Sequence, residues 1–196
     1  MNKLNVRVGV LVAIILVAVL SRLIFSYYEI YSFSPLVAIA LFGGSQFKNK
    51  GWAYFFPIAA FLISDLAFYL VGKTGFYGVS QFFVYSAILL ITALGTTLHN
   101  PKTIKILGYS LTGSALFWII SNFGVWVGSQ IPGSIEFEPG LTLGMTYLRA
   151  LPFYNEISTQ MFRNAFGGDI LYTFLLFGVY ALAQKTNPAL RYSNSQ

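Results

Sequence analysis

Long runs of apolar residues constrain the fold of this chain more than any other feature. The first covers residues 8–25 and is almost free of polar side chains before Ser21 and Arg22. A helix of about 20 apolar residues crosses a hydrocarbon core of about 30 Å. Further apolar runs follow along the chain, and we predict transmembrane helices at residues 8–25, 35–46, 51–72, 78–98, 103–127 and 166–184. The sequence therefore predicts an all-α integral membrane protein with about six transmembrane helices.

Composition indicates that lipid is the solvent for most of this surface. Charged residues make up 9% of the chain and hydrophobic residues 56%, whereas an ordinary soluble domain carries about 25% charged residues. We expect one transmembrane helical domain over residues 1–186 and a polar cytoplasmic tail over residues 187–196.

Two of the apolar segments have alternative interpretations. The segment 35–46 is short, so it is either a tilted or a half-inserted helix. The first segment follows Lys3 and Arg7, as the apolar part of a cleaved signal peptide does. Its length and the lack of a small-residue cleavage site favour a retained helix.

A long polar connection separates the last two predicted spans. Residues 128–163 include Pro132, Gly133 and acidic side chains, and are too polar to cross a membrane. Within it, residues 141–151 are expected to form a short interfacial or re-entrant helix that ends at Pro152. Loops of this length are usually functional lids or binding segments.

The charges predict the orientation, because Lys and Arg gather in cytoplasmic loops. With six spans, one side receives both termini and eight of the twelve basic residues, namely Lys3, Arg7, Lys48, Lys50, Lys102, Lys105, Lys185 and Arg191. The opposite loops carry acids, namely Glu29, Glu136, Glu138 and Glu156. We predict cytoplasmic N- and C-termini in a multi-pass protein of the bacterial inner membrane. The net charge of +6 then reflects this orientation and contact with anionic membrane lipid, not binding to nucleic acid.

The chain offers little for catalysis. It has no cysteine and a single histidine, His99, which excludes disulfides, thiolate chemistry and multi-histidine metal sites. No nucleophile–histidine pair and no phosphate-binding loop is visible. We predict a protein that is not an enzyme and that needs no metal or cofactor.

A few polar residues within the spans need a partner or a wet cavity, since a charge in a bilayer costs several kcal/mol. Arg22, Asp65 and Asp169 fall at similar depth near the outer face, and Asn122 reaches the same level. They either tie helices together or form the floor of a pocket that opens to the outside.

Aromatic residues in the outer loops favour the pocket, although an interfacial aromatic belt explains part of them. On this basis the predicted solute-binding residues are Arg22, Tyr28, Tyr31, Asp65, Asn122, Trp126, Phe153 and Asp169.

Several segments carry a family resemblance. They are Arg22-Leu-Ile, residues 33–44, Phe56-Pro57, Ser64-Asp65, residues 121–126, Leu151-Pro152-Phe153, Gly168-Asp169 and Phe177-Gly178. Together they resemble the DUF6580 family of bacterial membrane proteins, which is linked to transport. That family is similar to the S-components of energy-coupling-factor (ECF) vitamin transporters.

The resemblance implies an ECF S-component-like bundle of six helices with cytoplasmic termini and a vitamin site near the outer face. Some relatives of the S-components are solitary cobalamin transporters, which makes cobalamin the first substrate to consider. A cysteine ligand to cobalt occurs in some of them. This chain has no cysteine, and His99 is on the predicted cytoplasmic side, so the resemblance does not extend to cobalt ligation.

We therefore expect uptake of a small, vitamin-like solute, with Arg22 attracting an anionic group of the solute. Transport would either be facilitated diffusion or be driven by an energy-coupling module as partner. The alternative is an accessory subunit of a larger inner-membrane complex. Gly9 and Ala13, a small-xxx-small pair in the first span, are a weak signal for a helix–helix contact.

Overall fold

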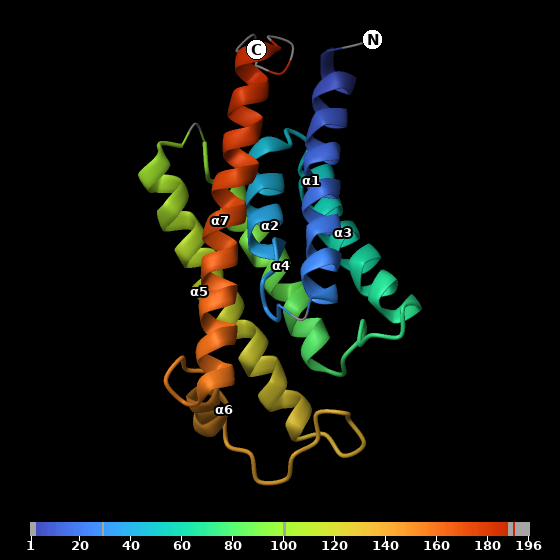
Figure 1. Ribbon diagram of the computed structural model, residues 1–196, viewed down its shortest axis with the longest axis vertical. Coiled ribbons are helices and arrows are strands. Elements are labelled where there is room, and N and C mark those ends of the chain that lie inside the picture. The colour runs from blue at the N-terminus through green and yellow to red at the C-terminus, as the bar shows by residue number, and fades with distance from the viewer. Residues whose placement is uncertain (1–2, 29, 100, 188–189, 191–196) are drawn as a thin grey trace.

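The computed structural model describes residues 3–28, 30–99, 101–187 and 190, of which residues 3–7 are described by their backbone alone. The described residues fold into α-helices and contain no strand (Figure 1). The helices are α1 (Lys3–Tyr27), α2 (Leu36–Gln46), α3 (Lys50–Leu70), α4 (Ser80–Thr96), α5 (Thr103–Ser129), α6 (Leu143–Arg149) and α7 (Glu156–Thr186). The all-helical prediction is confirmed.

Four of these helices are long and apolar enough to cross a membrane. They are α1 over Val8–Tyr27, α3, α5 and α7. Many of their large apolar side chains face outward, as expected where hydrocarbon replaces water; Val17 and Leu70 are 67% and 73% exposed. The chain is therefore a helical membrane protein.

Helix α2 lies in the centre of the bundle (Figure 1). All its residues from Val37 to Gly44 are buried. At about 1.5 Å per residue its 11 residues extend for about 16 Å, which is about half of a hydrocarbon core. The doubtful segment 35–46 is thus a short core helix, apolar all round because other helices surround it.

The backbones of α2 and α4 touch where they cross. A Cβ atom on Gly44 would lie 2.3 Å from the carbonyl oxygen of Thr92, and one on Gly95 would lie 2.6 Å from the carbonyl oxygen of Leu41. Neither carbonyl can move without disturbing its helix. Glycine at both positions therefore allows the central helix to pack against α4.

Gly44→Ala is expected to lower the free energy of unfolding by about 1–3 kcal/mol, because the new methyl group overpacks this crossing. The matched control is Gly108→Ala in α5, where an added Cβ would meet no atom within 4 Å. That control should be neutral or slightly stabilising, since alanine favours a helix more than glycine does. Thermal unfolding in detergent compares them, and equal melting temperatures would contradict this account of the crossing.

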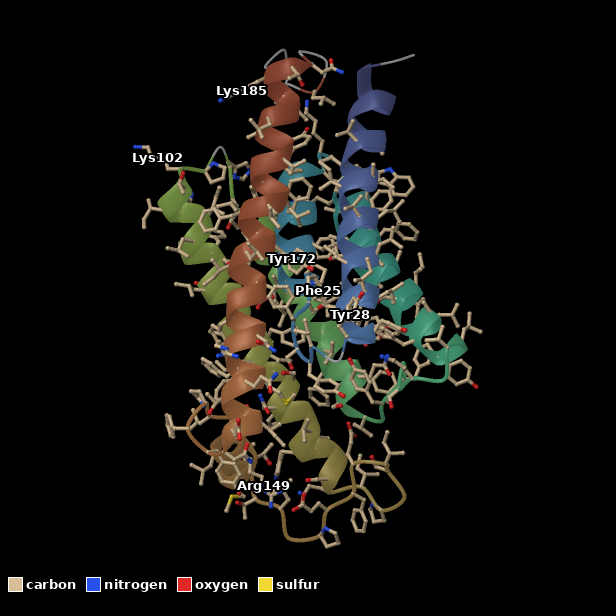
Figure 2. All side chains as sticks on the ribbon, viewed as in Figure 1. Phe25, Tyr28, Lys102, Arg149, Tyr172 and Lys185 are labelled. Atoms are coloured by element: carbon tan, nitrogen blue, oxygen red, sulfur yellow. The ribbon has the colours of Figure 1, made fainter. Side chains whose placement is uncertain are left out.

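Both termini lie at one end of the bundle, and α6 with its flanking loops lies at the other (Figure 1). We call these the terminus end and the loop end. Lys102 and Lys185 are at the terminus end and Arg149 is at the loop end (Figure 2). Of the charges used to predict the orientation, Glu29, Arg191 and the side chains of Lys3 and Arg7 lie outside the described residues, as does most of the predicted tail 187–196.

The last long helix begins ten residues earlier than its predicted span 166–184. Helix α7 starts at Glu156 because the side chain of Asn155 caps it, accepting a hydrogen bond from the amide of Ser158 at 2.8 Å. Its first turns are polar, which hid them from a search for apolar runs. The outer loop predicted at 128–163 is correspondingly shorter, and it contains the predicted short helix as α6, capped by Thr142.

Candidate functional site

A cavity of about 400 Å³ lies at the loop end between α5, α6 and α7. Most of its wall comes from two helices far apart in sequence. It is lined by Ser32, Ser114, Phe117, Trp118, Ser121, Asn122, Val125, Glu138, Leu141, Thr146, Arg149, Ala150, Ser158, Met161, Phe162, Ala165, Phe166 and Asp169. We call it the loop-end cavity.

Helical spacing brings these side chains to one wall. On α5, Ser114, Trp118 and Ser121 recur every three or four residues, and on α7 Phe162, Phe166 and Asp169 do the same. The rings of Phe162 and Phe166 stack with centroids 4.3 Å apart. The cavity thus has aromatic walls with a few polar groups among them, which is typical of small-molecule sites.

Asp169 is the buried acid of this cavity. Its side chain is 6% exposed, and its Oδ2 accepts a hydrogen bond from the Ser114 hydroxyl at 2.7 Å. Below it, the Thr173 hydroxyl donates to the Ser110 hydroxyl at 3.2 Å, so hydroxyl groups continue the seam between α5 and α7. Within the described part of the chain, no Lys, Arg or His forms an ion pair with Asp169. Asp169 therefore lines the cavity without an ion-pair partner among these residues.

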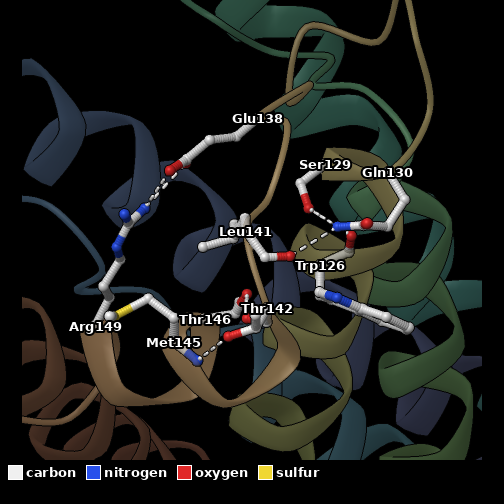
Figure 3. Close-up of polar contacts among 9 residues, drawn as sticks. All are labelled: Trp126, Ser129, Gln130, Glu138, Leu141, Thr142, Met145, Thr146 and Arg149. Atoms are coloured by element: carbon white, nitrogen blue, oxygen red, sulfur yellow. Dashed lines mark hydrogen bonds and ion pairs between the residues drawn. The ribbon is translucent and has the colours of Figure 1, made fainter.

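The rim carries an ion pair (Figure 3). The Arg149 Nη1 lies 2.9 Å from both carboxylate oxygens of Glu138, and both side chains are nearly half exposed. Hydrogen bonding to Glu138 raises the pKa of Arg149. A pair this exposed is screened by solvent and contributes little to stability, so these two side chains can separate easily.

Polar contacts fix the loop and α6 over the end of α5. The Gln130 Nε2 donates to the Leu141 carbonyl at 2.9 Å (Figure 3). The Tyr147 hydroxyl donates to the Ile119 carbonyl at 2.8 Å, and burial raises the pKa of this phenol. The Trp118 Nε1 donates to the Ala150 carbonyl at 3.3 Å. These hydrogen bonds therefore hold helix α6 against the second half of α5.

Glu136 joins the same loop to the start of α4. Its carboxylate accepts hydrogen bonds from the backbone amides of Val79 at 2.8 Å and Ser80 at 3.1 Å. Gly78 and Gly128 make room for it, since an added Cβ on either would lie within 3 Å of its oxygens. A carboxylate at a helix N-terminus satisfies free amides and favours the helix dipole.

Glu136→Gln is expected to lower the free energy of unfolding by about 1–2 kcal/mol and to speed amide exchange in the loop at 130–142, because the charge at the α4 terminus is lost. Glu138→Gln is the control from the same loop. Because its ion pair with Arg149 is exposed and screened by solvent, this substitution should lower the stability much less than Glu136→Gln does. Hydrogen exchange with mass spectrometry measures both, and equal effects would argue against the capping role.

The structure places the polar residues predicted for the site in two groups. Asn122 and Asp169 line the loop-end cavity, whereas Arg22 and Asp65 do not. The Arg22 Nη1 lies 3.0 Å from the Asp65 Oδ1 and also contacts the Ser64 hydroxyl. Its guanidinium lies over the Phe61 ring, 4.7 Å from the centroid.

Asp65 is satisfied from two further positions as well. It is 0% exposed, and its Oδ2 accepts hydrogen bonds from the Gln81 amide at 2.9 Å and the Tyr85 hydroxyl at 3.4 Å. Arg22 and Asp65 therefore tie α1, α3 and α4 together, the structural alternative considered for them above.

The predicted aromatic residues do not line the cavity either. Tyr28, Tyr31 and Phe153 are 68%, 60% and 77% exposed. The Trp126 ring packs against Phe123, with centroids 5.5 Å apart. The exposed rings suit an interfacial aromatic belt.

Sequence reasoning missed most of the wall. Ser114, Phe162, Phe166 and Arg149 were not among the predicted site residues, although all line the cavity. A signal for them was available in the recurrence of hydroxyl and aromatic residues every three or four positions on α5 and α7.

Comparison with known proteins identifies the family. No curated protein and no solved structure matches the chain. The family described as a family of unknown function, DUF6580, matches residues 2–190. With nearly the whole chain matched, this protein belongs to the DUF6580 family.

Proposed function

We propose that this chain is a membrane transport protein that binds a small organic solute with a positively charged nitrogen in the loop-end cavity, for uptake. The observation that carries the proposal is Asp169, a buried acid that lines an aromatic-walled cavity and has no ion-pair partner among the described residues. A buried charge in a membrane protein usually meets a partner or a substrate. A cationic group would supply the missing partner.

The aromatic wall supports the same class of solute. Trp118, Phe162 and Phe166 line the cavity with Asp169, and a cation over an aromatic face gains about 0.5–2 kcal/mol. Arg22 is engaged by Asp65 and is outside the cavity. An anionic solute would therefore lack the attraction first expected from Arg22.

The cavity volume limits the size of the solute. A value of about 400 Å³ is near the lower end of ligand pockets, which range from about 300 to 1,000 Å³. A vitamin-sized amine suits this volume better than cobalamin, whose corrin ring and nucleotide arm need far more space.

In the proposed orientation the protein crosses a bacterial inner membrane. Its loop end faces outward and its terminus end faces the cytoplasm. The bases Lys48, Lys50, Lys102, Lys105 and Lys185 support it, because their segments precede or follow spans on the terminus side. An inward-negative potential would favour entry of a cation by about 2.3 kcal/mol per charge per 100 mV. An energy-coupling module as partner is compatible with this scheme.

A thermal-shift screen tests the proposal. Purified protein is warmed with amine-containing vitamins and with neutral or anionic analogues of matched size. We expect that only the cationic compounds stabilise the wild type, and that they do not stabilise Asp169→Asn. Stabilisation by anionic members, or the same response in Asp169→Asn, would refute the charge-based recognition.

An accessory-subunit role is the second candidate, and the outer face of α1 favours it. Gly9 and Ala13 are exposed on this helix, and an added Cβ on Gly9 would meet no atom within 4 Å. Small residues four positions apart let another helix approach closely. Native mass analysis after mild extraction tests this role. A stable partner that Gly9→Leu releases would support it, and a lone monomer would count against it.

A further inference from the structure

A second, larger cavity of about 940 Å³ has no role in the proposed recognition of a solute. It lies among the last residues of α2 and α4, the starts of α3 and α5 and the second half of α7, and it also reaches residues 47–48, 98–99 and 101. These segments belong to the terminus end, where Figure 2 labels Lys102 and Lys185. We call it the terminus-end cavity.

The basic side chains of Lys48, Lys50 and His99 line this cavity. Among the residues that the structure describes, no aspartate or glutamate belongs to the lining. The hydroxyl group of Thr103 adds a possible donor in the same lining, whereas those of Ser45 and Thr96 donate to the Phe42 and Ala93 carbonyls. This set suits a phosphate-bearing anion and repels the cationic solute proposed for the loop-end cavity.

Another part of the wall is apolar, beside the polar side chains of Gln46, Tyr180 and Gln184. Phe47, Ile106, Phe174 and Phe177 line the cavity. Near its edge on α5, the side chain of Ile104 faces outward and is 73% exposed. Basic and apolar lining therefore meet in one cavity, as the headgroup and chains of a lipid require.

We propose that the terminus-end cavity binds an anionic phospholipid, with its phosphate toward Lys48, Lys50 and His99 and its acyl chains along the phenylalanine wall. A soluble phosphate would use the basic residues alone and leave the apolar wall uncovered. The inference is independent of the proposed transport function, because it concerns other residues.

The test measures lipid retention by the full-length protein in native mass spectrometry, with phosphatidylglycerol or phosphatidylcholine added in detergent. Lys48→Gln/Lys50→Gln removes two bases from the cavity. Lys102→Gln/Lys105→Gln is the matched control, because it removes the same charge at the start of α5, from residues outside the cavity lining. Thermal unfolding checks that both variants are folded.

Each basic side chain near a phosphate is expected to contribute about fivefold to affinity. We therefore expect wild type and control to prefer phosphatidylglycerol, and the cavity variant to lose at least about tenfold of that affinity. An equal loss of phosphatidylglycerol affinity in the two variants would show that only general surface charge matters, and would overturn the proposed site. Equal retention of the two lipids, or equally strong binding of soluble glycerol phosphate, would overturn the lipid assignment.

Discussion

Asp169→Asn is expected to weaken solute binding by at least about 30-fold, because removing one member of a buried charge pair costs about 2–5 kcal/mol. Asparagine keeps the size of the side chain and can still accept a hydrogen bond from Ser114, which is 2.7 Å from the carboxylate in the wild type. The measurement is the concentration of the best-binding amine that produces half of the maximal thermal shift.

The same substitution separates a binding role from a structural one. Without ligand, Asp169→Asn should be as stable as the wild type or more stable, since a neutral amide replaces a buried acid that has no ion-pair partner among the described residues. Glu156→Gln, at the exposed start of α7 and outside the cavity lining, is the control and should bind normally. A loss of stability with unchanged binding would make Asp169 a packing residue.

Arg22→Leu should have the largest effect on stability, a loss of about 3–5 kcal/mol, because it leaves the fully buried Asp65 without its counter-charge. The double variant Arg22→Leu/Asp65→Asn should recover more than half of that loss. The asparagine that replaces Asp65 carries no charge, and its side-chain oxygen can still accept a hydrogen bond from Gln81. Thermal unfolding in detergent measures all three proteins.

A control and a second readout sharpen this prediction. Arg163→Leu, at an exposed position of α7, should change stability little. The double variant should bind the solute as the wild type does, because Arg22 and Asp65 do not line the loop-end cavity. If it binds no solute although it is folded, Arg22 belongs to the binding site after all.

Hydrophobicity predicted the helices because a segment that crosses a bilayer must be apolar and must satisfy its backbone hydrogen bonds internally. The spans 103–127 and 51–72 agree with α5 and α3 within two residues at each end. The start of α7 escaped because Ser158, Arg163 and Asn164 make its first turns polar. A cap at Asn155 sets that boundary, and an apolar run does not reveal it.

The sequence predicted how deep the site residues lie in the membrane, but not which neighbouring helix each of them faces. The sequence placed Arg22, Asp65 and Asp169 at one level of the membrane, yet level alone does not say which helix faces face each other. Helix crossings decide that, and here Arg22 meets Asp65 while Asp169 meets Ser114 on α5. Glu136 was recognised only as an outer acid, because its partners at Val79 and Ser80 are distant in sequence.

The most direct test of the central claim pairs two ligands with two proteins. A cationic amine found in the screen and its uncharged isostere, with a hydroxyl in place of the ammonium group, are titrated against wild type and Asp169→Asn. We predict that wild type prefers the amine by at least about 30-fold and that Asp169→Asn loses this preference. The same preference in both proteins would show that Asp169 does not recognise the charge, and would contradict the proposed site.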